Sequence, residues 1–178
     1  MTGPSGLSIR AQAAWPEPGD DLVPPLPGFV HSAFNPLVAA VADRCLRRAH
    51  RAMPARDADA DADAERTAIV LVSPTGDEAS AAHVRAAVAA DRRPGPLFFF
   101  QSVPNSVAGH VAARWGLGGP VVCLAPTDDP RAAGFAQADL LLYDGDADAV
   151  LLILIDTAPD DGDVESAVAV LLGGGDRP

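Results

Sequence analysis

Short, wholly apolar runs that alternate with helical segments constrain the fold of this chain more than any other feature of its sequence. The runs are Ile69–Val72, Val121–Ala125 and Ala149–Ile155. The last run is apolar on both faces, which is typical of a central strand in a parallel sheet. Helical patterns fill the intervals, over Ala79–Ala90, Asn105–Trp115 and from Asp129-Pro130 to about Tyr143. The alternation predicts an α/β fold, with helices packed on a mostly parallel mixed sheet.

Three further segments complete the expected elements. Leu7–Trp15 alternates weakly and predicts a strand, whereas Val164–Leu172 fits a strand or a helix. Asn35 followed by Pro36 predicts a helix start, with Asn35 as the N-cap. The helix that follows is amphipathic, because its apolar residues recur at helical spacing along one face. A sheet of about five strands follows from this count.

Composition and charge restrict the classes of function. Apolar residues make up 48% of the 178 residues and aromatic residues only 5%, which favours close helix-on-sheet layers. The net charge of −11 disfavours binding to nucleic acid and to anionic membranes. The longest apolar run is too short to cross a bilayer, and the first residues lack the pattern of a signal peptide. We therefore expect a cytoplasmic protein.

The chain is expected to form one domain over residues 1–178, with an acidic linker at 54–66 and a flexible tail at 173–178. The linker is an Asp-Ala alternation that lacks the glycine and the closing glutamate of a calcium loop. The glycine clusters lack the spacing and the lysine of a phosphate loop. No paired zinc ligands or Ser-His-Asp order stand out, so we expect no metal and no cofactor.

One segment carries a sequence motif in addition to its hydrophobic periodicity. The stretch Phe100–Val111 contains Val-Pro-Asn-Ser-Val-Ala-Gly, and Arg114–Pro120 ends in Gly-Leu-Gly-Gly-Pro. Together they resemble the part of β-ketoacyl synthases that precedes the active-site cysteine. The resemblance extends over Thr67–Ile155, and more loosely over Ser32–Leu46. It implies a layered, thiolase-like half-domain, because complete members of that family consist of two similar halves.

The departures from that family decide what the resemblance implies for function. In condensing members, the strand after Gly-Pro leads to a cysteine at the start of the next helix. Counting from Pro120, the matching position is at or beside Asp128, so no catalytic residue is assigned. Cys123 lies earlier, inside the predicted strand, and is expected to pack in the core. The two catalytic histidines of the family belong to the other half, and His110 is expected to be a packing or surface residue.

The resemblance therefore implies a catalytically silent partner subunit, similar to the chain length factors of polyketide synthases. Such a subunit serves a polyketide or fatty-acid synthase that uses an acyl carrier protein, and it pairs with a complete ketosynthase or with itself. In the family, the strand equivalent to Val121–Ala125 pairs across the dimer. An uncovered sheet edge and helix face would favour such association.

Two sets of residues are candidates for this role. An acyl-pocket and interface set comprises Phe98, Phe99, Phe100, Gln101, Asn105, Val121, Val122 and Cys123. Core packing is the alternative for the phenylalanines. A basic face for docking an acidic carrier protein comprises Arg44, Arg47, Arg48 and Arg51, for which a solvated helix face is the alternative.

Two other functions stay open at this point. The chain could be a degenerate acyltransferase or decarboxylase in which Asp128 or Asp129 acts, although a perturbed carboxylate is not visible in sequence. It could also be a stand-alone homodimer that binds acyl chains or acts as a scaffold.

Overall fold

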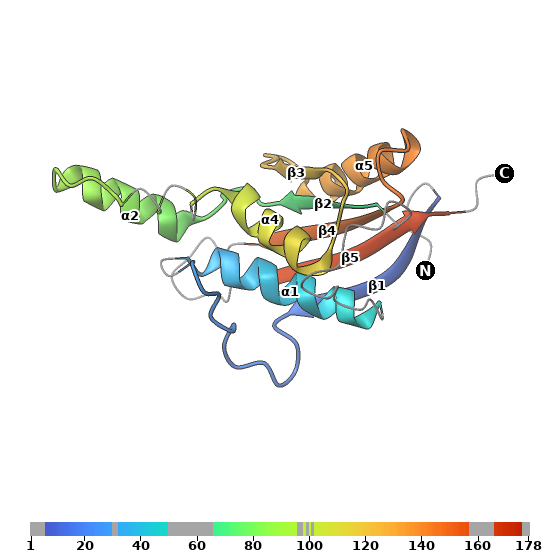
Figure 1. Cartoon of the computed structure of the whole chain (residues 1–178), viewed down its shortest axis with the longest axis horizontal. Helices are drawn as coiled ribbons and strands as arrows, with labels where there is room; N and C mark the ends of the chain where they lie inside the picture. The colour runs from blue at the N-terminus through green and yellow to red at the C-terminus, as the bar shows by residue number, and fades with distance from the viewer. Residues whose placement is uncertain are drawn as a thin grey trace.

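Figure 1 shows a computed structural model of the chain. It describes residues 6–29, 32–49, 66–95, 98, 100, 102–156 and 166–175. The proposed acidic linker lies outside these residues, except for Arg66. The Arg66 backbone N–H donates to Asp148 Oδ2 at 2.8 Å, which joins this residue to the start of the sheet rather than to a solvated linker.

One mixed sheet organises the fold. Its strands are β1 (Leu7–Trp15), β2 (Thr67–Val72), β3 (Val121–Leu124), β4 (Ala149–Asp156) and β5 (Ser166–Gly174). The spatial order is β1-β5-β4-β2-β3, so β1 and β3 form the two edges. β2 pairs in parallel with β3 and β4, whereas β4–β5 and β5–β1 are antiparallel. The predicted five-stranded mixed sheet is confirmed, with its parallel part confined to β3, β2 and β4.

Helices cover both faces of the sheet (Figure 1). α1 (Phe34–Arg48) and α4 (Pro104–Trp115) pack on one face, and α5 (Pro130–Tyr143) packs on the other. The layers are held by aliphatic side chains. β4 contributes to both of them, because Leu151 and Ile153 face α1 while Val150 and Leu152 face α5. A strand buried on both sides explains why its sequence is uninterruptedly apolar.

α2 (Glu78–Ala89) is placed differently from the other helices. It extends away from one end of the layers, and none of the other described elements packs along it (Figure 1). Only Ser80 and Ala87 are buried on this helix, and Val88 is 66% exposed. We call residues 78–95 the α2 arm. The sequence predicted this helix correctly but gave no indication that it would leave the sheet.

The predicted N-cap of α1 is wrong by two residues, and α4 begins one residue before its predicted start. α1 begins at Phe34, and the Ser32 hydroxyl accepts the Asn35 backbone N–H at 2.9 Å. α4 begins at Pro104, so Asn105 lies inside its first turn. In both helices the asparagine amide forms a bond to another side chain instead of capping its own helix. Proline supplies no N–H at the first turn, which lets the helix start at or before it.

The predicted flexible tail is also corrected at its start. Gly173 and Gly174 belong to β5 and pair with Ser8 and Leu7 of β1, and the Gly175 N–H donates to Gly6 at 2.8 Å. Residues 176–178 lie outside the described part. A side chain at Gly173 would overlap the guanidinium of Arg10, so glycine permits this packing. The ambiguous segment before it is therefore a strand.

Candidate functional site

The β3 edge is the first feature of the candidate site. β3 pairs with β2 on one side only, and Val121 is 37% exposed. The carbonyls of Pro120 and Leu124 accept N–H groups from the β2 side, at 2.9 and 3.0 Å. Because backbone groups alternate along a strand, the N–H and C=O of Val121 and Cys123 point away from β2. They form the row that an added strand would bind.

Cys123 is held at this edge by Asn105. Its Sγ–H donates to Asn105 Oδ1 at 2.8 Å, which joins β3 to the first turn of α4. Burial raises the pKa of the Cys123 thiol, so the unreactive thiol form is favoured. Cys45 is buried in α1, and burial raises its pKa to about 11. Neither cysteine has the exposed, electropositive environment that activates a catalytic thiol.

A cavity of about 170 Å³ opens beside Cys123. It lies where β2 and β3 end, between Phe34 of α1 and Pro104 of α4. The carboxyl ends of parallel strands are the usual ligand-binding edge of an α/β sheet. The structure thus brings two residues of the predicted set together beside this cavity, namely Asn105 and Cys123, whereas Val122 packs on the opposite face of the sheet with α5.

The start of α5 holds the position where the resemblance places a catalytic cysteine. Asp129, and not Asp128, caps this helix, because its Oδ1 accepts the Ala132 N–H at 2.9 Å. Asp128 is exposed on the preceding loop. A second cavity, of about 370 Å³, lies beside Asp129 and Arg131. The geometry offers a solvated carboxyl group at a helix start and no nucleophilic thiol.

The phenylalanines of the predicted pocket separate into two environments. Phe98 is buried against the arm, with its ring centroid 4.7 Å from that of His83. Phe100 is 65% exposed. Phe99 and Gln101 lie outside the described residues. Phe98 thus fits the packing alternative, and Phe100 keeps most of its surface exposed.

A buried polar contact at the root of the α2 arm was not expected. Asp77 caps α2 by accepting the Ser80 N–H at 3.0 Å and the Ser80 hydroxyl at 2.6 Å. It also accepts Asn35 Nδ2 at 3.1 Å, which ties the arm to α1. Asp77, Ser80 and Asn35 are all buried. The N-cap preference for aspartate signals the first role, but nothing local signals the second.

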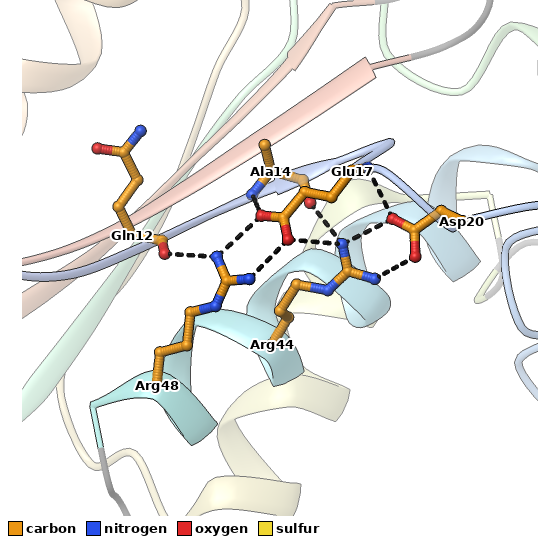
Figure 2. Close-up of polar contacts among 6 residues, drawn as sticks. All are labelled: Gln12, Ala14, Glu17, Asp20, Arg44 and Arg48. Atoms are coloured by element: carbon orange, nitrogen blue, oxygen red, sulfur yellow. Dashed lines mark hydrogen bonds and ion pairs between the residues drawn. The ribbon is translucent and has the colours of Figure 1, made fainter.

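The arginines of α1 are paired with acidic residues, and Figure 2 shows the group around Arg44 and Arg48. Arg44 binds both carboxylate oxygens of Asp20 at 2.7 Å, and Arg48 binds those of Glu17 at 2.8 and 2.6 Å. Hydrogen bonds from Arg48 lower the pKa of Glu17 to about 2. Bonds from Arg44 likewise lower the pKa of Asp20.

Arg47 forms a separate pair on the same helix. It binds Asp43 at 2.7 Å, and its guanidinium lies 5.7 Å from the centre of the Trp115 ring. Arg51 lies outside the described residues. The described arginines therefore offer little unpaired positive charge, and carrier docking on this face stays a prediction. Sequence reasoning missed Glu17 and Asp20 because they lie in the proline-rich loop, far along the chain from α1.

His110 lies against a groove rather than in a catalytic group. The groove has a volume of about 250 Å³ and is bounded by α1, α4 and the prolines of residues 24–27. Burial and the nearby Arg114 lower the pKa of His110, which favours the neutral ring. In the described part of the chain, no three His, Cys, Asp or Glu side chains come together as metal ligands would. No described helix combines the length and apolarity needed to cross a bilayer.

Comparisons with solved structures show related folds. A chain in the complex of the ketosynthase ApeO with its chain length factor ApeC, from Xenorhabdus doucetiae, superimposes with a TM-score of 0.72 at 18% identity. The match covers 96% of this chain and 80% of that chain. The ishigamide ketosynthase/chain length factor gives a TM-score of 0.67 at 17% identity, covering 98% and 64%.

A third similar structure is AntDE:AntF, a type II PKS acyl-carrier protein in complex with its ketosynthase bound to the hexaketide. It gives a TM-score of 0.60 at 11% identity, covering 94% of this chain and 62% of that chain. This chain thus spans four-fifths of the ApeO–ApeC match and just under two-thirds of the other two. At these identities the likeness establishes the thiolase-like ketosynthase fold alone.

The family comparison is more specific. No curated protein sequence matches the chain. The family described as "Beta-ketoacyl synthase, N-terminal domain" matches residues 15–166. That span runs from the end of β1 to the first residue of β5 and includes the β3 edge, the α2 arm and the start of α5. The chain therefore belongs to the β-ketoacyl synthase N-terminal domain family.

Proposed function

We propose that this chain is a ketosynthase-like partner subunit, of the chain-length-factor type, which supports a complete ketosynthase and does not condense acyl groups itself. The complex would serve a polyketide or fatty-acid synthase that uses an acyl carrier protein. One observation carries the proposal. The resemblance places the family's cysteine at or beside Asp128, which is exposed, while burial raises the pKa of both thiols of the chain.

The comparisons support a partner role. Two of the similar structures contain a ketosynthase together with a chain length factor. In the ApeO–ApeC complex the matched chain is only slightly longer than this one, since 96% of this chain covers 80% of it. A third similar structure contains an acyl carrier protein bound to its ketosynthase, which supports a carrier-dependent pathway.

The β3 edge and the α2 arm are the contact elements that we propose. The outward backbone groups of Val121 and Cys123 can accept a strand of the synthase. The arm presents Val88, which is 66% exposed, and no other described element packs along the arm; Phe100, beyond the arm, is 65% exposed. Exposed apolar side chains on an unpacked helix favour burial against a partner.

The first experiment is co-expression with a complete ketosynthase from the same gene neighbourhood, followed by size-exclusion chromatography and a condensation assay. We expect co-elution and condensing activity that needs both chains. Val121→Pro removes an outward N–H at the first residue of β3, where proline is tolerated, so binding should become roughly tenfold weaker or more. Ala14→Pro removes an outward N–H at the opposite edge, where that group is bonded to Glu17, and should leave binding to the synthase unchanged.

Other outcomes would replace the proposal. A stable homodimer that ignores the synthase would favour an independent acyl-binding or scaffold protein. If the chain alone turned over malonyl-loaded acyl carrier protein, and Asp128→Asn abolished that turnover, a degenerate decarboxylase or acyltransferase would be favoured. An unchanged product length with Phe100→Ala in the active complex would exclude a role of that side chain in the acyl pocket.

A further inference from the structure

The two edges of the sheet differ in length and in what covers them. β1 has nine residues, whereas β3 has four. A long edge strand presents a row of free backbone groups and is a site of unwanted strand pairing. β1 pairs only with β5, so its outer side is the larger hazard of the two.

Side chains from α1 and from the loop after β1 occupy that outer side (Figure 2). The Arg48 guanidinium donates to Gln12 O at 3.0 Å, and the Arg44 guanidinium donates to Ala14 O at 2.8 Å. The Ala14 N–H donates to Glu17 Oε1 at 3.0 Å. An incoming strand would need these same three backbone groups for its own ladder.

The charged groups that make these contacts hold one another in place. Arg44 is bidentate to Asp20, and the Glu17 backbone N–H donates to Asp20 Oδ2 at 2.7 Å. Arg44 also lies over the Trp15 ring, 4.8 Å from its centre. The Arg44 and Asp20 side chains are 24% and 16% exposed, so water screens this pair less than a pair at the open surface. Bidentate pairs fix orientation as well as distance.

We propose that Glu17, Asp20, Arg44 and Arg48 form an edge cap, which prevents β1 from accepting a strand and directs strand pairing to β3. The β3 half of this statement rests on the proposed function. Without the cap, the occupant of the β1 edge is β1 of a second copy of this chain. Two identical antiparallel edges related by a twofold axis are self-complementary, and an isologous contact of this kind closes as a dimer.

The test uses a cap-deleted variant, Glu17→Ala/Arg44→Ala/Arg48→Ala, in a Val121→Pro background, so that all three outward groups are freed and β3 does not contribute to association. Multi-angle light scattering and sedimentation are measured across a wide concentration range. The background variant with its cap intact should stay monomeric, and the cap-deleted variant should become a dimer. Arg47→Ala is the matched control, because Arg47 lies on the same helix but pairs with Asp43 and not with β1. It should stay monomeric.

A blocking variant identifies the surface that pairs. Ala14→Pro removes the outward N–H of β1, and proline is accepted on an edge strand whose N–H faces solvent. Added to the cap-deleted variant, it should restore the monomer. If the cap-deleted variant loses its folded circular dichroism spectrum, Glu17→Ala alone carries the same test, because it frees the Ala14 N–H and releases Arg48.

A folded cap-deleted variant that stays monomeric at every concentration would overturn the proposal. So would a dimer that survives Ala14→Pro, because the pairing would then involve another surface. The proposed function fails separately, when Val121→Pro leaves binding to the synthase unchanged. The β1 result is independent of that outcome, since no synthase is present in the association measurement.

Discussion

The buried contact between Asp77 and Asn35 makes a quantitative prediction about the root of the α2 arm. The two oxygens of Asp77 accept three hydrogen bonds, from the Ser80 N–H, the Ser80 hydroxyl and Asn35 Nδ2. Asp77→Asn leaves one acceptor oxygen and places an NH₂ group against a donor. Asparagine caps helices about as well as aspartate, so the variant chiefly removes the buried bond.

Leaving a buried donor without its acceptor costs about 1–3 kcal/mol of unfolding free energy. A loss of about 2 kcal/mol lowers the Tm of a chain of this length by roughly 4–8 °C. Urea and thermal unfolding measure both quantities. Asp129→Asn is the matched control, because Asp129 also caps a helix, by accepting the Ala132 N–H, but is exposed. Its effect should stay within about 0.5 kcal/mol.

A rescue variant and an exchange measurement sharpen this prediction. Asn35→Asp combined with Asp77→Asn exchanges donor and acceptor, and should recover most of the lost stability. Hydrogen exchange along α2 should become faster in the single variant, because the tie to α1 is lost. The reasoning is refuted if Asp77→Asn and Asp129→Asn have equal effects, or if the double variant is no more stable than Asp77→Asn.

Two further predictions concern the edge cap and the packing before β3. The bonds from Arg48 lower the pKa of Glu17 from 4.5 to about 2. The pairing of the ionised Glu17 with Arg48 therefore stabilises the fold fully above pH 4.5, and this stabilisation is lost as the pH falls from 4.5 to about 2. The Tm of the wild type should therefore fall over that acidic range, and Glu17→Gln should flatten this part of the Tm–pH curve; parallel curves would contradict the assignment. A Cβ at Gly119 would lie 2.5 Å from the Ala68 backbone N, whereas Gly118 has open space. Gly119→Ala should cost about 1–3 kcal/mol in urea unfolding and Gly118→Ala almost nothing, and similar costs would show that the backbone adjusts freely.

The sequence predicted the strands whose neighbours lie on both faces. β2 and β4 were identified because both faces of each are buried, which makes their sequences apolar throughout. β3 was identified from its short apolar run after Gly-Pro. β5 was ambiguous, since a run of Ala, Val and Leu carries no polar alternation to distinguish a strand from a helix. The cap at Asn35 was misplaced because its amide has a partner on another element, which local spacing cannot reveal.

The candidate site was predicted less completely, because residues that contact one another in it lie far apart along the chain. Periodicity placed Arg44 and Arg48 on one face, but the acidic residues that neutralise them follow β1 and reach α1 only after the proline-rich loop turns back. The buried bond that ties the α2 arm to α1 joins Asp77 and Asn35, which are 42 residues apart. The resemblance, by contrast, indicated that the position of the family's cysteine falls at or beside Asp128, which lies on the loop before α5.

The pairing of β1 with β5 has a consequence for how the chain acquires its fold during synthesis. Ser8 and Gly173, which contact one another across this pair, are 165 residues apart. At translation rates of about 5–20 residues per second, β5 is synthesised roughly 8–30 s after β1. Arg44 and Arg48 are only 24 and 31 residues from Asp20 and Glu17, so they emerge from the ribosome early in that interval. The side chains of the edge cap can then cover the outer side of β1 before β5 is synthesised. Only the side of β1 that pairs with β5 is exposed to chaperones and to neighbouring chains during that interval.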